Sequence, residues 1–303
     1  MKIITSGSKY IDIDAYASII AYRELLKLKG IEAKAVSTAK TNESITESLL
    51  NLNIKLDKYI ENEEDEFIVI DVSNKDFFDE IVKENKIIEI IDHHVGFEEY
   101  WKNKLGEKSN IEFIGAVATI IFELYEKEKL ISNISKDVAK LLMCAILDNT
   151  LNFKAKVTKE RDIQAYNKLK IIAGIDNNFA EKYFIECEKI ITKDLKNAVK
   201  NDTKVEKISN ILPLVFGQLL VWDKENVLKN KQEIVQTLEN IDKEWMMNLI
   251  CLKDGKSYII ANDSAVKNGL EKLLNGKFEN DIMELNDVWL RKEIIKKARK
   301  LDR

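Results

Sequence analysis

Residues 87–94 read Ile87-Ile88-Glu89-Ile90-Ile91-Asp92-His93-His94 and include both histidines of this 303-residue chain. The isoleucine-rich run predicts a short buried β-strand. The strand would end in a carboxylate and two adjacent imidazoles. These groups are common ligands of divalent metals, and histidine also transfers protons near neutral pH. The stretch is therefore a candidate hydrolytic metal site, with a plain surface turn as the alternative.

Composition limits the class of protein. Hydrophobic residues make up 45% of the chain, enough for a substantial core, and this length predicts two domains. The 48 basic and 52 acidic residues give a net charge of -4, which argues against a broad surface for duplex nucleic acid. We expect a cytoplasmic protein without a membrane partner, because no signal peptide or membrane-spanning run is evident. Cys144, Cys187 and Cys251 are expected to be reduced.

Strand-like and helix-like patterns alternate along the first half of the chain. This alternation predicts an α/β fold, with a parallel sheet that has helices on both faces. The expected strands cover residues 2–5, 32–37, 67–70, 87–91 and 111–114. The expected helices cover residues 14–29, 43–52, 116–129 and 136–147.

Acidic side chains follow several of these strands. Asp12 and Asp14 come after the first strand, Asp71 ends the third, and Asp92 ends the fourth. In open parallel sheets, ligands bind at the carboxyl ends of the strands, so these carboxylates should converge beside the histidines. Asp148, after an apolar helical run, is a further candidate. Each aspartate alone is more readily explained as a helix cap or turn former, but their shared placement favours a site.

Four segments, taken in order, resemble motifs of the DHH phosphoesterases, and among these the manganese-dependent family II inorganic pyrophosphatases and related exopolyphosphatases. They are Gly7-Ser8-Lys9-Tyr10-Ile11-Asp12-Ile13-Asp14-Ala15, Asp71 after its strand, Asp92-His93-His94, and Ala145 to Lys154. The helix entry Gly115-Ala116-Val117-Ala118-Thr119 is also similar to the family's. The resemblance covers nearly the whole chain.

The C-terminal part resembles the second type of accessory domain in this family, called DHHA2. No Gly-Gly pair or histidine follows residue 200, whereas Leu290-Arg291-Lys292-Glu293 is similar to a Ser-Arg-Lys-Lys motif of that domain, and Lys204 lines up with a phosphate-contacting lysine. The resemblance implies a DHH catalytic domain over residues 1–192, a linker at 193–201, and a smaller mixed α/β phosphate-binding domain over 202–303. Strands are expected at residues 212–220, 246–252 and 257–260. The family resemblance also implies that the protein can form a homodimer.

The resemblance further implies hydrolysis of phosphoanhydride bonds in pyrophosphate or short-chain polyphosphate, by a hydroxide that bridges two divalent cations, Mn²⁺ or Mg²⁺. The implied metal ligands are Asp12, Asp14, Asp71, His93 and Asp148, with Asp71 as the bridge. His94 would contact the substrate or act as general acid, and Asp92 would orient an imidazole. The implied phosphate-binding residues of the second domain are Lys204, Arg291 and Lys292.

Two features keep alternatives open. Ser8 occupies the place of a family histidine, which leaves the first metal site with oxygen donors that favour Mg²⁺. A DHH phosphodiesterase or nucleotidase acting on another phosphoester, or a non-catalytic family member that binds metal or nucleotide, is therefore also considered. Arg291 and Lys292 could instead begin a solvated basic helix, and both could reach one phosphate only from a loop or a helix N-terminus.

Overall fold

A computed structural model describes residues 1–301 of the chain. The chain divides into two compact units, one of residues 1–180 and one that begins at Glu181. Helix α7 (Phe179–Lys193) spans this division, and most of the segment 193–201 forms helix α8 (Leu195–Asn201). The domain bounds implied by the family resemblance stay a prediction.

The first unit is built around one parallel sheet. Its strands are β1 (Lys2–Thr5), β2 (Ala33–Ala35), β3 (Glu66–Ile70), β4 (Ile87–Asp92) and β5 (Ser109–Ile111). They lie in the order β2-β1-β3-β4-β5, and each neighbouring pair is parallel. Because parallel strands end at the same edge of a sheet, the residues after β1, β3 and β4 lie at one edge. The predicted α/β class is confirmed.

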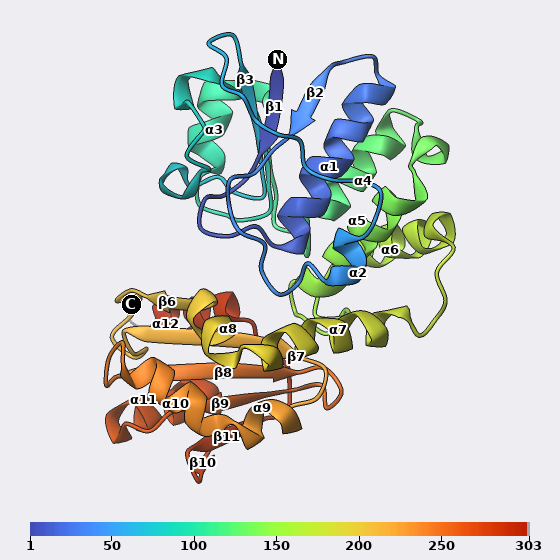
Figure 1. The fold of residues 1–303 in the computed structure, drawn as a ribbon. Coiled ribbons are helices and arrows are strands. Elements are labelled where there is room, and N and C mark those ends of the chain that lie inside the picture. The colour runs from blue at the N-terminus through green and yellow to red at the C-terminus, as the bar shows by residue number, and fades with distance from the viewer. Residues whose placement is uncertain (302–303) are drawn as a thin grey trace. The chain divides into compact units, whose positions relative to one another are not determined.

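Helices cover both faces of this sheet. Figure 1 shows α3 on one face, where Trp101 packs against the strands, and α1 and α4 on the other. The helices of the unit are α1 (Ile13–Leu28), α2 (Glu47–Leu50), α3 (Glu98–Leu105), α4 (Val117–Lys127), α5 (Lys136–Asn149) and α6 (Glu160–Ala173). Short 3₁₀ turns span Lys75–Phe77, Glu84–Lys86, Gly106–Lys108 and Ile131–Asn133. Helix α1 is buried along most of its length because small and apolar residues dominate it.

Two predicted elements differ from the observed ones. The helix expected over residues 43–52 is a single turn, because Ser44 instead accepts a hydrogen bond from the backbone of Ile13. The strand expected at 111–114 lies at Ser109–Ile111, because those residues pair with the last three of β4. The chain then leaves the sheet, which puts Ile114 beside the end of β4.

The second unit has a mixed sheet, as expected. Its strands are β6 (Thr203–Val205), β7 (Val215–Val221), β8 (Trp245–Cys251), β9 (Lys256–Ile260), β10 (Phe278–Glu279) and β11 (Ile282–Leu285). They lie in the order β10-β11-β9-β8-β7-β6, and only the β7–β8 pair is parallel. The three predicted strands correspond to β7, β8 and β9.

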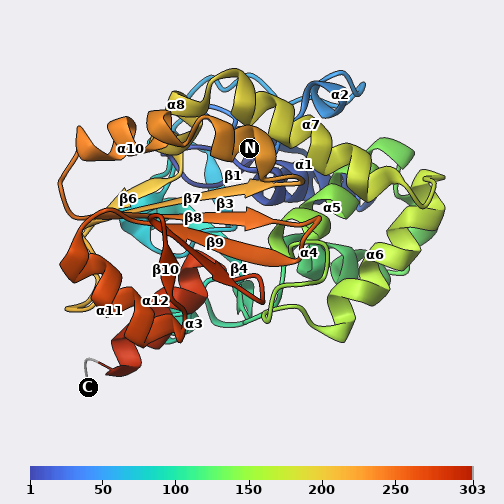
Figure 2. The same ribbon diagram turned by 90° about the horizontal axis from the view of Figure 1, so that it is seen from below.

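Helices also cover both faces of the second sheet. They are α9 (Glu225–Lys229), α10 (Lys231–Glu239), α11 (Ser264–Leu274) and α12 (Arg291–Leu301), together with α7 and α8. Side chains alternate along β7: Val215 and Leu219 enter the core under α8 and α10, whereas Phe216 enters the core under α11 and α12. Figure 2 shows these two helical layers on either side of the strands. Among residues 1–301, no helix has the length and apolar character needed to cross a membrane.

Candidate metal centre

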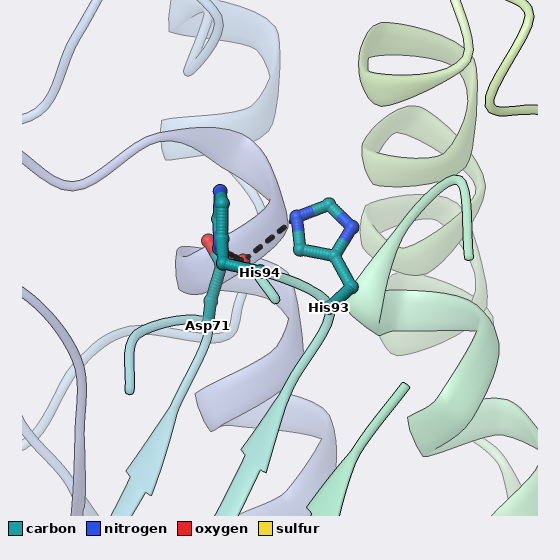
Figure 3. A group of neighbouring side chains, drawn as sticks. All are labelled: Asp71, His93 and His94. Carbon is teal, nitrogen blue, oxygen red and sulfur yellow. Dashed lines mark ion pairs between the residues drawn. The ribbon is translucent and has the colours of Figure 1, made fainter. Parts of the chain in front are cut away.

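Three side chains meet where β3 and β4 end. Asp71, His93 and His94 each offer a ligand atom, and these atoms all lie within 4.8 Å of one another (Figure 3). The Nε2 atom of His93 is 3.3 Å from Oδ1 of Asp71, and Nδ1 of His94 is 3.8 Å from the same oxygen. Asp14 approaches from α1, with Oδ2 3.9 Å from Nε2 of His93.

The backbone at Asp71 directs its carboxylate toward the histidines. Asp71 has a left-handed conformation with φ 66°, and its N–H donates to the carbonyl of Ile91 at 2.9 Å. Aspartate and asparagine adopt this conformation more readily than most other residues. The strand therefore ends in a sharp change of direction that a β-branched residue would not tolerate.

His93 is held in one orientation by a backbone carbonyl. Its side chain is 2% exposed, and Nδ1 lies 3.2 Å from the carbonyl oxygen of Ile114. A carbonyl only accepts hydrogen bonds, so Nδ1 carries a proton. Nε2 faces two carboxylates, and either a second proton or a cation must lie there to make that arrangement favourable. Histidine held in this way, with carboxylate oxygens opposite, fits a divalent metal.

Asp14 is fixed by the start of α4. Its two carboxylate oxygens accept hydrogen bonds from the N–H groups of Val117 and Ala118, each at 2.9 Å. The Asp14 side chain is fully buried. The partial positive charge of a helix N-terminus stabilises a carboxylate in this position. These two N–H groups therefore stabilise a negative charge on the Asp14 carboxylate, beside His93.

One carboxylate oxygen of Asp92 contacts both histidines. One oxygen, Oδ1, accepts hydrogen bonds from the N–H groups of His93 at 2.7 Å and His94 at 3.1 Å. The same oxygen lies 2.9 Å from Nδ1 of His94. Asp92 is fully buried, whereas the side chain of His94 is 56% exposed. His94 can therefore meet a ligand from solvent while Asp92 controls its orientation.

The remaining candidates of the first unit are Asp12 and Asp148, together with Ser8. Among the described residues, Asp12 and Asp148 are outside the group of Asp71 and the two histidines. Asp12 is the N-cap of α1, where its carboxylate accepts from the N–H of Ala15, and Asp148 lies in the last turn of α5. Ser8 is exposed, and its backbone N–H bonds to the carbonyl of Phe77 at 2.9 Å.

The N-terminal part of the chain matches a known protein family. Residues 2–146 match the family model described as the DHH family, N-terminal domain. This part of the chain is therefore similar to the N-terminal domain of the DHH family. A Bacillus cereus protein named a probable manganese-dependent inorganic pyrophosphatase is 28% identical over 313 residues, which cover 97% of this chain and 96% of the relative. The family match and such relatives point to a phosphohydrolase.

Two solved structures share the fold. One from Methanococcus jannaschii, described as a candidate family II inorganic pyrophosphatase, has a TM-score of 0.71 at 23% identity and covers 99% of this chain and 100% of its own. An exopolyphosphatase-related protein from Bacteroides fragilis has a TM-score of 0.53 at 17% identity, with coverage of 99% and 90%. At these identities the likeness establishes the architecture alone.

Two cationic candidates of the second unit, Lys204 and Arg291, lie near the β6 edge of its sheet. Lys204 lies on β6 opposite Phe216 of β7, and the carbonyl of Phe216 accepts from Nη1 of Arg291 at 3.3 Å. Arg291 also donates to the carbonyl of Asp202 at 2.7 Å and pairs with its carboxylate. Two segments almost 90 residues apart are thereby joined, and Lys292 follows Arg291 in the first turn of α12.

Arg291 is far more enclosed than a residue on a solvated helix face. It is 8% exposed and begins α12, so its position is one from which it and Lys292 could approach the same anion. Its guanidinium forms an ion pair with Asp202. A basic residue on a solvated helix face would not need such a partner. The contacts with Asp202 and Phe216 use three of the five N–H donors of the guanidinium, so two donors remain for a phosphate.

The sequence did not predict the backbone groups that position His93 and Asp14 of the metal centre. They are the carbonyl of Ile114, which faces His93, and the N–H groups of Val117 and Ala118, which bind Asp14. The signal available was the helix entry Gly115-Ala116-Val117-Ala118-Thr119. It marked a helix start but did not show which side chains that start would hold.

Proposed function

We propose that this protein hydrolyses the phosphoanhydride bond of inorganic pyrophosphate or short-chain polyphosphate in the presence of divalent cations. The observation that supports this best is the fixed, buried His93, whose Nε2 lies 3.3 Å from Asp71 while Nδ1 faces a carbonyl. The DHH match and the pyrophosphatase names of the relatives agree with it.

The proposed metal ligands are Asp12, Asp14, Asp71, His93 and Asp148, which together would hold two cations with Asp71 between them. Imidazole nitrogen with carboxylate oxygen suits Mn²⁺, and a side of the site with oxygen donors alone also accepts Mg²⁺. The name of the Bacillus cereus relative supports manganese. When bound, such cations neutralise phosphate oxygens and lower the pKa of water.

We assign proton transfer to His94. Its exposed side chain can contact a substrate phosphate, and Asp92 holds Nδ1 so that Nε2 points away from the protein backbone. An imidazole in this position can donate a proton to the leaving phosphate. Asp92 touches no substrate atom in this scheme, and its contribution is to fix the ring.

The substrate anion requires further positive charge, which we assign to Lys204, Arg291 and Lys292. The contacts of Arg291 with Asp202 and Phe216 bring the start of α12 to the strand that carries Lys204. Lysine provides a point charge and arginine a planar fork, and both groups stabilise phosphate oxygens. Asp202 would then tune the position of Arg291.

The two histidines provide a matched test, because they are neighbours with different proposed roles. Phosphate release would be measured from pyrophosphate, tripolyphosphate and nucleoside triphosphate, with Mn²⁺ or Mg²⁺. His93→Gln should lose tight metal binding together with activity. His94→Gln should keep metal binding and lose about 10²- to 10⁴-fold in kcat. Preference for the nucleotide would favour a different phosphoester, and no release from any substrate would refute hydrolysis.

A further inference from the structure

A buried carboxylate outside the metal centre binds two separate segments of the DHH domain. Asp162, in the first turn of α6, is fully buried. Its Oδ2 accepts from the N–H groups of Lys159 at 2.8 Å and Gly115 at 3.2 Å. Its Oδ1 accepts from the hydroxyl of Thr119 at 2.6 Å. Three donors compensate the cost of burying this charge.

Capping of α6 explains only part of this arrangement. A carboxylate at the third helical position commonly returns to the N-cap backbone, which accounts for Lys159. Gly115 and Thr119 lie 47 and 43 residues away and belong to the entry of α4. A Cβ atom on Gly115 would come within 2.5 Å of Oδ2 of Asp162, so the glycine is required for this close approach.

Asp162 binds the segment from Ile114 to Thr119, and the backbone of this segment contacts the metal centre. Its first residue, Ile114, provides the carbonyl that faces Nδ1 of His93. Its N–H groups at Val117 and Ala118 bind both oxygens of Asp14. Asp162 fastens this segment at Gly115 and again at Thr119, on either side of the two N–H groups.

We propose that Asp162 is a positioning residue for the metal centre. It fixes the entry of α4 so that His93 presents Nε2, and Asp14 its carboxylate, to one divalent cation. This inference rests on the proposed function only in assigning a cation to these ligands. Outer groups that orient metal ligands typically contribute 10- to 100-fold in metal affinity.

The primary test is Asp162→Asn, which keeps the shape but replaces one acceptor oxygen by an NH₂ group. Calorimetry should show Mn²⁺ binding about tenfold weaker than in the wild type. In a ¹H–¹⁵N spectrum without metal, the slowly exchanging Nδ1–H of His93 should shift or be lost. The spectrum is simple because His94 is the only other histidine.

Asp65→Asn provides the matched control. Asp65 is a buried carboxylate of the same unit, 3% exposed, and accepts from the N–H of Asn62 at 3.1 Å. It precedes β3, at the opposite end of that strand from Asp71. This variant should lower stability without changing Mn²⁺ affinity or the His93 signal.

Thr119 gives a second route in case Asp162→Asn does not fold. Thr119→Val removes the hydroxyl that donates to Asp162, whereas Thr119→Ser retains it. The valine variant should weaken Mn²⁺ binding several-fold and alter the His93 signal, and the serine variant should restore both. An unchanged His93 signal with Mn²⁺ affinity within about twofold of the wild type, in either Asp162→Asn or Thr119→Val, would overturn the inference. A wild type that binds Mn²⁺ but hydrolyses nothing would instead refute the proposed function alone.

Discussion

Asp71→Asn is the most informative single substitution, because it removes a charge that we propose binds metal, with little change in backbone preference. Asp71 has φ 66°, a conformation that asparagine adopts readily and alanine does not. The asparagine variant should therefore fold as the wild type does. An Asp71→Ala variant should be less stable without metal, by about 1–2 kcal/mol, because of the left-handed backbone.

The expected magnitude follows from the proposed role of Asp71 as a direct ligand. Loss of groups that only orient a ligand weakens metal binding about 10- to 100-fold, so loss of Asp71 should reach at least about 100-fold. At a free Mn²⁺ concentration about 100 times the wild-type Kd, binding stabilises the wild type by about 2.7 kcal/mol and the variant by about 0.4 kcal/mol. For a unit of residues 1–180, these free energies correspond to a rise in Tm of about 5–11 °C for the wild type and about 1–2 °C for the variant.

The assay is thermal unfolding of wild type, Asp71→Asn and Asp71→Ala, each with EDTA and with a series of Mn²⁺ concentrations. Calorimetric titration provides an independent Kd. The asparagine variant should match the wild type in EDTA and diverge as Mn²⁺ is added. An equal Mn²⁺-induced rise in Tm for wild type and Asp71→Asn would refute the assignment of Asp71 as a metal ligand.

Three further substitutions test other parts of the account. Ser8→His should tighten Mn²⁺ binding about tenfold in calorimetry by adding a nitrogen ligand, and unchanged affinity would contradict a metal site there. Trp101→Phe should lower the free energy of unfolding in urea by about 2–4 kcal/mol, since the Nε1–H that donates to the Ser73 carbonyl at 2.7 Å is lost from a buried site; a loss under about 1 kcal/mol would contradict this. Hydrogen bonds from the Tyr100 hydroxyl and the Lys104 ammonium lower the pKa of Glu84 from 4.5 to about 2. The Glu84 carboxylate therefore stabilises the fold above pH 4.5, and this contribution is lost as the pH falls toward 2. Glu84→Gln should therefore be less stable than the wild type at pH 7, with a difference that shrinks as pH falls below 4.5, and a constant difference would count against the interaction.

Local sequence patterns were sufficient to predict the architecture of the first unit. The run before Asp92 is apolar because β4 is covered on both faces, and alternating helices make neighbouring strands parallel. From parallel strands alone it follows that Asp71 and the two histidines end at one edge. The short strands β6, β10 and β11 were not predicted, because two to four residues carry too little periodic pattern.

The contacts that orient the side chains of the metal centre could not be predicted in the same way. Whether Nδ1 or Nε2 of His93 faces the site depends on a carbonyl 21 residues later, and that carbonyl is in place because the chain leaves the sheet after Ile111. The contact between Asp162 and Gly115 joins residues 47 apart through side-chain packing. Such contacts are products of tertiary structure, and no local propensity encodes them.

The most direct measurement is a crystal structure with Mn²⁺, in which anomalous scattering locates the ion. An anomalous peak within bonding distance of both Nε2 of His93 and the carboxylate of Asp71, with Nδ1 of His93 still on the Ile114 carbonyl, is the expected result. A manganese ion bound elsewhere, or a His93 ring turned so that Nε2 no longer faces Asp71, would contradict the proposed centre.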